Sequence, residues 1–309
     1  MTSRTDPAQS VCAVIVTYRP DNARLEQILL ALNSTVKSVV IIDNASPQMN
    51  EARLREICGV LALRRLDTNK GIGAAQNQGV ALARGMGCRY VLFLDQDSVP
   101  QADMVKSLSH TLERLRSEGH KVACVGPRVR FPGSGDLSVF ARPGWIRQRR
   151  TPCRDVEMAI ECDFLISSGS LIPLDVIDVV GGMEEDLFID QVDTEWCFRA
   201  RSKGYCVYGA CGAILEHSLG ETIHRIWMGR WRRLPRHKPL RYYYIFRNTL
   251  LLSGRSYVSV RWILSQVKWL TALFLAYGLF AWPRTGELPM MVKGIVHGIR
   301  GVTGKLEHQ

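Results

Sequence analysis

Short runs of β-branched residues alternate with helical patterns through the first half of this chain, and this alternation limits the fold more than any other feature. The runs that predict strands are residues 11–17, 38–43, 61–66 and 90–94. The segments with helical spacing are residues 25–32, 72–85 and 104–115. Strands separated by helices form a mostly parallel sheet with helices on both faces. The sequence therefore predicts an α/β domain that binds ligands where its strands end.

The pattern changes after the fourth run. Gly, Pro and Arg dominate residues 128–154, which is typical of a long loop or flap. Ordered structure is predicted to return at 161–171, with helices at 175–180 and 193–202 and a last strand at 207–215. We therefore expect the α/β domain to occupy residues 1–220.

Residues 221–309 differ in composition and predict a helical extension. Residues 225–241 are basic, and residues 240–252 have helical spacing. The apolar segment 262–282 is interrupted by two polar residues, and its continuous part is shorter than the roughly 20 residues of a membrane-spanning helix. We therefore expect an interfacial helix, or one of a pair buried together, rather than a span.

The charge balance favours anionic partners. The chain contains 40 Lys and Arg against 29 Asp and Glu, a formal net charge of +11. Phosphorylated substrates, nucleic acid and an anionic bilayer all fit such a charge. The sequence has no helix-turn-helix, zinc-ligand pattern or RNA-binding strand motif, so nucleic-acid binding is the weaker alternative.

The cysteines and the N-terminus both predict a cytosolic location. The nine cysteines are scattered and no two have CxxC spacing. We expect reduced, mostly buried thiols. The first ten residues are polar and contain no apolar segment typical of a secretory signal.

Two acids flank one residue directly after the fourth apolar run, as Asp95-Gln96-Asp97. Like charges so close repel each other unless a cation neutralises them. A hard divalent ion with oxygen ligands does this and also binds phosphates. The structural alternative is a helix N-terminus, because a Ser-Val-Pro segment follows and acids favour that end of a helix.

A glycine-rich segment opens the helix predicted at 72–85. It contains Asn69, Gly71, Gly73 and Gly79. Glycines at a helix start allow the backbone to approach a phosphate or a ribose closely. Neither the GxGxxG nor the GxxxxGK[ST] motif is present, so close packing of the helix against a strand is the alternative.

Three acids lie within six positions further along the chain, at Asp190, Asp193 and Glu195. A carboxylate beside a reacting hydroxyl can act as a general base. A solvated acidic helix start is the structural alternative. His217 follows the last predicted strand, where a single histidine is more often structural than a metal ligand.

In this order and spacing, these segments resemble glycosyltransferase family 2. The resemblance rests on the strand that ends in Thr17-Tyr18-Arg19, the step at Asp43, the Asn-x-Gly-x-Gly helix start, the DxD pair and the late acidic motif, and it covers residues 11–220. It implies a GT-A fold, with a Rossmann-like, mostly parallel sheet flanked by helices and a C-terminal helical, basic extension. It also implies an inverting transfer of a sugar from a nucleotide sugar. A sugar nucleotidyltransferase would have a glycine-rich loop near the N-terminus, which this chain lacks.

The resemblance assigns roles residue by residue. The positions that match the family's nucleotide-sugar site are Thr17, Tyr18, Arg19, Asp43, Asn69, Gly71, Asn77, Asp95, Gln96 and, in a C-terminal segment, Arg247. Those that match its metal site are Asp95, Asp97 and His217, with Mg²⁺ or Mn²⁺ as the implied ion. Asp193 matches the catalytic base. Glu195 is the next acidic position of that motif. Many members have Glu-Asp as the base motif, whereas Val192 precedes Asp193 here, so Asp190 is a rival for the base or for acceptor contact.

Within the family, the segments around Asp95 and Asp193 look most like bacterial rhamnosyltransferases. Those enzymes use dTDP-L-rhamnose to build O-antigen and related surface polysaccharides. The donor is therefore expected to be dTDP-L-rhamnose, with a UDP- or GDP-sugar as the alternative.

The resemblance also implies an acceptor glycan, free or linked to polyprenyl diphosphate, and an enzyme that is peripheral on the inner face of the cytoplasmic membrane. Basic side chains beside tryptophans are suited to anionic headgroups, although a solvated basic face is the simpler alternative. The residues that this hypothesis concerns are Trp227, Arg230, Trp231, Arg232, Arg233 and Arg236.

Overall fold

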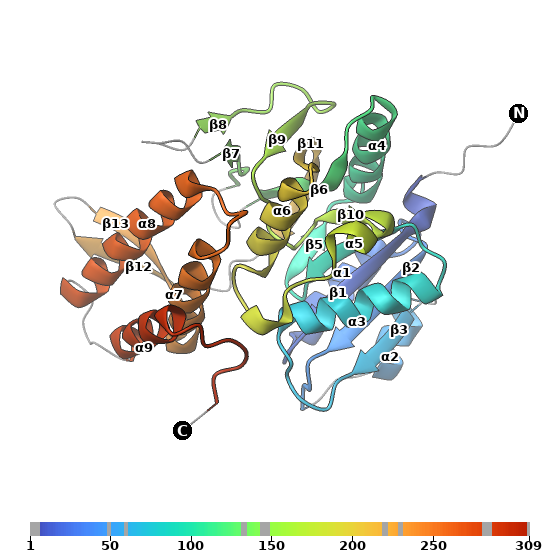
Figure 1. The fold of residues 1–309 in the computed structure, drawn as a ribbon. Helices are drawn as coiled ribbons and strands as arrows, with labels where there is room; N and C mark the ends of the chain where they lie inside the picture. The colour runs from blue at the N-terminus through green and yellow to red at the C-terminus, as the bar shows by residue number, and fades with distance from the viewer. Residues whose placement is uncertain are drawn as a thin grey trace, which may run out of the picture.

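A central sheet with helices on both faces forms one part of the molecule, and three C-terminal helices lie beside it (Figure 1). The computed structural model describes residues 7–47, 51–58, 61–130, 135–142, 149–217, 222–227, 231–279 and 286–307. The predicted α/β class is confirmed, and so is the helical extension after it.

The first half of the sheet is parallel, in the order β3-β2-β1-β4. Its strands are β1 (Val11–Thr17), β2 (Ser38–Asp43), β3 (Leu61–Arg65) and β4 (Tyr90–Asp95). Every residue of β2 is buried, as expected for a parallel strand covered on both faces. All four predicted strands therefore form, with ends within one residue of those predicted.

The second half of the sheet mixes directions. Strand β6 (Val122–Arg130) pairs in parallel with β11 (Cys206–His217), and the short strand β10 (Leu171–Pro173) joins β6 to β4 in antiparallel pairing. Two further short strands, β5 (Ser98–Pro100) and β9 (Ala159–Cys162), are antiparallel to β11. The sheet is thus less uniformly parallel than predicted, because strands of three or four residues are too short to show a hydrophobic period.

Two layers of helices cover the sheet. On one face lie α1 (Asn22–Leu32), α2 (Glu51–Ile57) and α4 (Met104–Ser117), and on the other lie α3 (Ile72–Gly85), α5 (Leu174–Val180) and α6 (Val192–Ser202). Each layer has its own hydrophobic core against the sheet. Two short 3₁₀ turns, Pro7–Ser10 and Glu185–Leu187, precede β1 and α6.

The predicted loop at 128–154 is partly ordered. Strand β6 continues to Arg130, and a small hairpin of β7 (Phe140–Arg142) and β8 (Arg149–Thr151) follows. The segments 131–134 and 143–148 lie outside the described residues. The hairpin depends on contacts that composition does not reveal.

One pair of cysteines departs from the predicted reduced state. Cys153 and Cys211 form a disulfide, because the segment that contains Cys153 lies against β11, where the Cys211 N–H donates to the Met158 carbonyl at 3.0 Å. The other seven cysteines form no disulfide, and six of them are buried. The prediction of mostly buried thiols is confirmed, and the prediction of full reduction is wrong for this pair.

The C-terminal part begins with a hairpin and continues as three packed helices. The hairpin strands are β12 (Thr222–Trp227) and β13 (Trp231–Arg236), and the helices are α7 (Pro239–Ser253), α8 (Val260–Leu279) and α9 (Glu287–Ile299). Gly294 and Gly298 let α9 approach α7 closely, since an added Cβ at Gly294 would lie 2.5 Å from the Tyr243 carbonyl oxygen. The arginines and tryptophans expected to meet headgroups lie outside the residues whose side chains are described.

The three helices are firmly joined to the α/β part. Trp262 of α8 is buried against Phe198 of α6, with ring centroids 5.6 Å apart, and belongs to the same core as α3 and α5. Among the described residues, α8 is the one helix long and apolar enough to cross a membrane, with mean hydropathy 1.2, and core helices also meet this criterion. Its place in a bilayer stays a prediction.

Candidate active site

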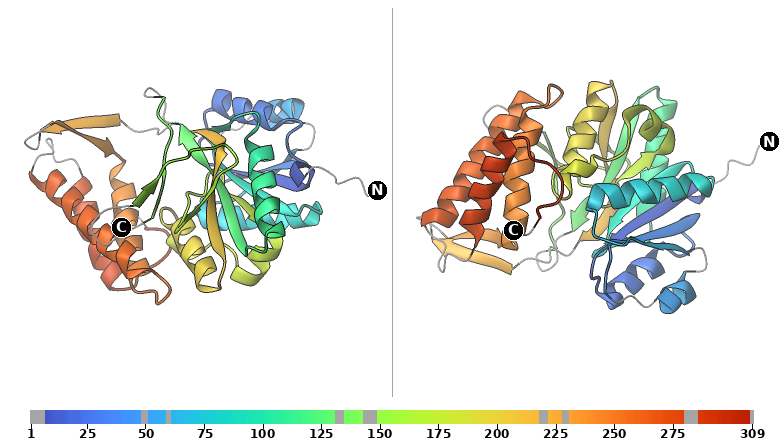
Figure 2. Two further views of the ribbon diagram at one scale, coloured as in Figure 1. Left: turned by 90° about the horizontal axis from the view of Figure 1, so that it is seen from above. Right: turned by 60° about the horizontal axis from the view of Figure 1, so that its bottom comes forward.

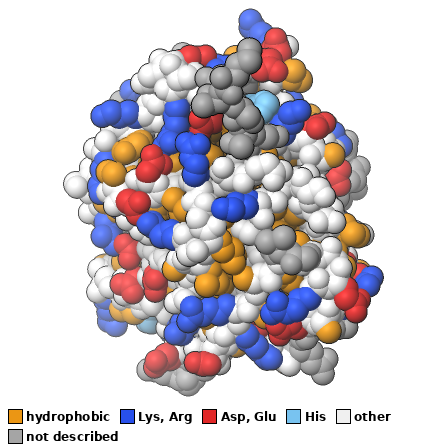
Figure 3. Space-filling view, turned by 90° about the vertical axis from the view of Figure 1, so that its right-hand side faces the viewer, with side chains coloured by type: hydrophobic (Ala, Val, Ile, Leu, Met, Phe, Trp, Pro, Cys, Tyr) orange, Lys and Arg blue, Asp and Glu red, His pale blue; other side chains and the backbone are white. Residues whose placement is uncertain are grey.

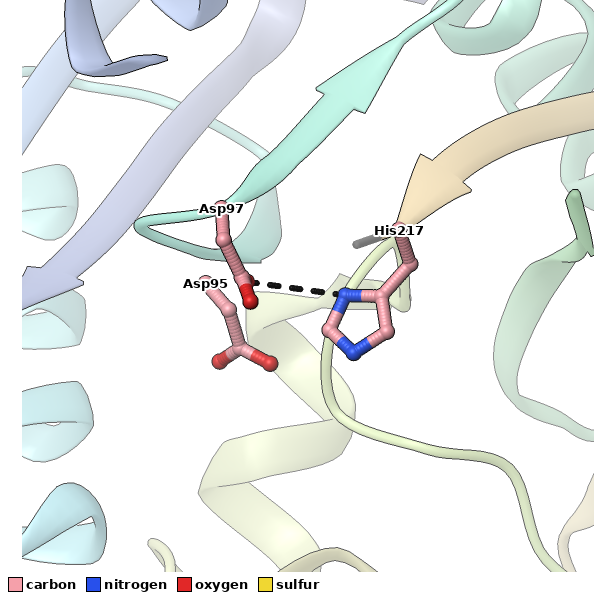
Figure 4. Close-up of side chains that lie close together, drawn as sticks. All are labelled: Asp95, Asp97 and His217. Atoms are coloured by element: carbon pink, nitrogen blue, oxygen red, sulfur yellow. Dashed lines mark ion pairs between the residues drawn. The ribbon is translucent and has the colours of Figure 1, made fainter. Parts of the chain in front are cut away.

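Two acids and a histidine meet at one edge of the sheet (Figure 4). Asp95 ends β4 and Asp97 lies in the turn before β5, while His217 ends β11. Antiparallel pairing of β5 with β11 places His217 opposite Ser98. One ligand atom from each of the three residues lies within 4.8 Å of the others. The structural alternative for Asp95 and Asp97 is wrong, because a strand follows them and α4 begins only at Met104.

The three side chains form a donor set suited to a divalent cation. Asp97 Oδ1 lies 3.6 Å from His217 Nδ1, which in turn lies 2.6 Å from Ser98 Oγ. The pKa of Asp95 is raised to about 6, chiefly by burial. The charges of Asp97 and Asp193 contribute to this rise, while His217 and Arg241 oppose it. The ionised form of Asp95 beside Asp97 and Asp193 is therefore unfavourable unless a cation lies close to them. Two carboxylates and an imidazole fit Mg²⁺ or Mn²⁺ in chemistry and spacing.

Asp193 lies in the first turn of α6 and shares this electrostatic environment. Its Oδ2 accepts the Ser167 N–H at 3.0 Å, and its Oδ1 accepts the Thr194 N–H at 2.7 Å. Burial raises the pKa of the Asp193 carboxyl, while these hydrogen bonds lower it. The charge of Asp193 acts on Asp95, so the two carboxyls belong to one site. A fixed, partly desolvated carboxylate has the properties of a general base.

Arg241 is a cation of this site that we did not single out from the sequence. It lies in the first turn of α7, and its Nε donates to Asp190 Oδ1 at 3.2 Å. Its charge lowers the pKa of Asp95, so it lies near the acidic cluster. Burial and Arg241 together lower the pKa of His237 to about 4, which keeps that imidazole neutral at pH 7. The one sequence signal was that Arg241 ends the basic stretch.

Glu195, the next acid of the motif, is paired inside the core. Its side chain is fully buried, and its two oxygens accept hydrogen bonds from Nε and Nη2 of Arg199, each at 2.8 Å. The Tyr257 hydroxyl donates to the same carboxylate at 2.6 Å. A buried carboxylate must be paired in this way, since an unpaired charge in the core is costly. Glu195 therefore joins α6 to the segment before α8.

Arg247, predicted to meet the diphosphate, has its guanidinium engaged by backbone carbonyls and a neighbouring side chain. The side chain is fully buried in α7. Its Nη2 donates to the Leu187 carbonyl at 2.9 Å, its Nη1 to the Gly304 carbonyl at 2.5 Å and its Nε to Asn248 Oδ1 at 2.8 Å. The guanidinium thus joins the segment at Gly304, which follows α9, to the loop before α6.

Two predicted pocket residues meet where β1 and β2 end. Thr17 Oγ1 donates to Asp43 Oδ1 at 2.9 Å, and the Ser46 N–H donates to Asp43 Oδ2 at 2.8 Å. Asp43 is fully buried, and Arg65 lies 3.7 Å from its Oδ2. The carboxylate therefore fixes the loop after β2.

The turn of the DxD pair is joined to the loop after β1. The Tyr18 N–H donates to Gln96 Oε1 at 2.7 Å, and Gln96 Nε2 donates back to the Tyr18 carbonyl at 3.3 Å. Arg19 has φ of 51°, and its N–H donates to Ser46 Oγ at 2.7 Å. Tyr18, Arg19 and Gln96 thus lie together at the same strand ends as Asp95.

The glycine-rich segment packs closely against its neighbours. An added Cβ would lie 2.4 Å from the Phe188 carbonyl oxygen at Gly71 and 2.2 Å from Val14 Cγ1 at Gly79. Asn69 Oδ1 accepts the Gly71 N–H at 3.0 Å and so shapes this turn. Asn77 Nδ2 donates to the Met183 carbonyl at 2.9 Å and Asn77 Oδ1 accepts the Met183 N–H at 2.8 Å, which fixes the loop before α6.

Comparisons with known proteins agree with this geometry. Residues 12–177 match the sequence profile of "Glycosyl transferase family 2". The chain is 29% identical over 300 residues to the "dTDP-rhamnosyl transferase RfbF" of Shigella flexneri. The aligned region covers 96% of this chain and 97% of that protein.

Solved structures share the fold at low sequence identity. S. aureus TarS in complex with UDP-GlcNAc has a TM-score of 0.57 at 15% identity, covering 94% of this chain and 81% of that one. GalNAc-T7 with UDP, GalNAc and Mn²⁺ has a TM-score of 0.58 at 13% identity over 84% of this chain, which spans about half (54%) of that longer protein. The sheet, the Asp-Asp-His cluster and the sequence match lead to one conclusion: the chain is a glycosyltransferase and belongs to glycosyl transferase family 2.

Proposed function

We propose that this enzyme transfers L-rhamnose from dTDP-L-rhamnose to a glycan acceptor, with inversion at the anomeric carbon. The observation that carries the donor assignment is the similarity to the dTDP-rhamnosyl transferase of Shigella flexneri over nearly the full length of both chains. The acceptor is a sugar of a growing cell-surface polysaccharide such as O-antigen, carried on polyprenyl diphosphate.

The proposed roles of the site residues rest on the family resemblance, and their positions support them. Asp193 takes the proton of the acceptor hydroxyl as its oxygen attacks the anomeric carbon, and the nucleoside diphosphate leaves on the opposite face of the sugar. Asp95, Asp97 and His217 hold Mg²⁺ or Mn²⁺, which when bound offsets the charge of the diphosphate. The residues that we propose to line the nucleotide pocket are Thr17, Tyr18, Arg19, Asp43 and Gln96, which meet at the adjoining strand ends.

The division of the chain is part of the same proposal. Residues 1–220 form the donor-binding and catalytic domain, and residues 221–309 form an extension that directs the site toward its acceptor. Support comes from α7, which brings Arg241 to Asp190 and buries Arg247 against the loop before α6. An enzyme with a lipid-linked acceptor and a nucleotide-sugar donor works in the cytoplasm, peripheral on the inner face of the cytoplasmic membrane.

A donor panel tests this function. We expect the purified protein to bind and slowly hydrolyse dTDP-L-rhamnose in preference to UDP- and GDP-sugars, with Mg²⁺ or Mn²⁺ and not with EDTA. Calorimetry and nucleotide release measure the two steps. A preference for a UDP- or GDP-sugar would contradict the rhamnose assignment while keeping the metal site. Donor binding that is equal with metal and with EDTA would contradict the metal site as well.

Replacing Arg241 tests whether the extension contributes to the active site. We expect Arg241→Gln to lower kcat/KM about 10–100-fold. The loss should be smaller than for a fully buried group that donates to a developing charge, because the Arg241 side chain is 45% exposed. Steady-state kinetics with the preferred donor measure the effect. Arg255→Gln is the matched control, since Arg255 is 43% exposed and follows the other end of α7. Equal effects of the two substitutions would argue against a role for Arg241 in the active site.

A further inference from the structure

Helix α8 exposes an apolar face to solvent. Trp262, Leu270, Leu273 and Tyr277 form its buried side. The opposite side carries the exposed aliphatic residues Val260 (61% exposed), Leu264 (43%), Val267 (50%), Leu275 (51%) and Leu279 (68%). Their spacing of three, four or eight residues places them along one stripe of the helix. A helix on the surface of a soluble protein usually has a polar outer side, so this face lacks a partner among the described residues.

Helix α9 repeats this arrangement beside it. Met291, Gly294 and Gly298 face inward, and the latter two pack on α7. Val292, Val296 and Ile299 are 47%, 37% and 75% exposed. Figures 1 and 2 show α8 and α9 side by side at the end of the molecule away from α2 and α3, and the two helices are in contact. We call the eight exposed aliphatic residues of these two helices the α8–α9 surface.

The charges around the α8–α9 surface are almost all positive. Helix α8 has no acidic residue, and its Arg261 and Lys268 are exposed. Lys293 lies on α9 and Arg300 directly after it, whereas the one acid of α9, Glu287, is buried. By contrast, the face of the molecule in Figure 3 has acidic side chains interspersed among the basic ones. Apolar side chains flanked by cations are the composition of helices that lie on anionic bilayers.

The packing of α8 favours a position on the bilayer over one across it. Trp262 of α8 packs against Phe198 of α6, and Leu270 and Leu273 belong to the same hydrophobic core as residues of α7. If α8 crossed the bilayer, these side chains would have to leave the helices that they pack against. Of the most apolar 18-residue window of α8, 28% is buried, which leaves a wide face for a second environment.

We propose that the α8–α9 surface docks on an anionic lipid bilayer, with both helices in the plane of the interface. This inference rests on the proposed function, because a lipid-linked acceptor presents its sugar at that interface. The contacts of α7 with Asp190 and Leu187 then hold the catalytic centre in a fixed position relative to the membrane. A symmetric dimer through the same surface would bring the flanking cations of two copies together, so we favour the bilayer.

Vesicle co-sedimentation of the full-length protein tests the proposal. We expect binding to phosphatidylcholine–phosphatidylglycerol vesicles and little binding to phosphatidylcholine alone. Leu264→Gln/Leu275→Gln should weaken the binding about tenfold or more through lost apolar burial. Lys268→Gln should weaken it about fivefold at low salt. Leu30→Gln is the matched control, since Leu30 is 61% exposed on α1, in the catalytic domain.

The outcomes separate this proposal from the proposed function. Loss of vesicle binding in the double variant, with donor hydrolysis kept and the Leu30 variant unaffected, supports docking. Absence of binding by the unaltered protein to anionic vesicles, or equal binding by the double variant, overturns it even if the donor panel succeeds. A dimer in sedimentation velocity that the double variant disrupts, without vesicle binding, overturns it in favour of an interface between copies.

Discussion

Asp193→Asn is expected to lower kcat about 10²–10⁴-fold, the usual contribution of a general base. The amide keeps the size of the carboxylate and can still accept the Ser167 N–H, which Asp193 accepts at 3.0 Å. It cannot take a proton from the acceptor. The dissociation constant of the donor should change little, because the base acts on the acceptor. Single-turnover transfer and donor binding by calorimetry measure the two effects separately.

Asp190→Asn distinguishes the rival base. Asp190 is paired with Arg241, so its carboxylate is already engaged by a cation. We expect this substitution to have the smaller effect on kcat and to act through the position of Arg241. Near-wild-type turnover in Asp193→Asn together with a large loss in Asp190→Asn would transfer the role of base to Asp190.

Asp97→Ala is expected to remove metal-dependent donor binding and to lower turnover about 10²–10⁴-fold, because the charge of the departing diphosphate then lacks its counter-ion. Binding of Mn²⁺, followed by calorimetry, should be lost in the same variant. His217→Ala should reduce Mn²⁺ affinity in the same direction, since His217 Nδ1 lies 3.6 Å from Asp97 Oδ1.

The control for this prediction is Asp103→Ala. Asp103 is an exposed acid six residues after Asp97 that precedes α4, outside the Asp-Asp-His cluster. It should bind metal and donor like the unaltered protein. If Asp97→Ala kept the Mn²⁺ affinity of the unaltered enzyme, Asp97 would not be a metal ligand, and the donor would depend on another site.

The sequence alone predicted many of the regular elements of the catalytic half. Periodicity is local, so strands such as β1 and β2 and a helix such as α3 could be located to within one or two residues. The position of Asp95 and Asp97 at the end of a buried strand was equally local. Helices α2 and α9, strand β6 and the shorter strands β5, β7, β8, β9, β10, β12 and β13 were not predicted. Short elements that are held by distant partners show no clear period.

Tertiary structure decided which polar groups share a site and which support the core. The sequence placed Asp193 and Glu195 two residues apart without separating their roles. In the structure, Glu195 lies inside the core against Arg199, while the charge of Asp193 acts on Asp95 of the acidic cluster. His217 reaches Asp97 only because β5 pairs with β11, which joins residues 119 positions apart. Likewise, the packing of α7 brings Arg241 to the site and buries Arg247. Local pattern fixes what each segment forms, whereas burial and long-range pairing fix what each charge can contact, and in this protein the second of these selects the active-site residues.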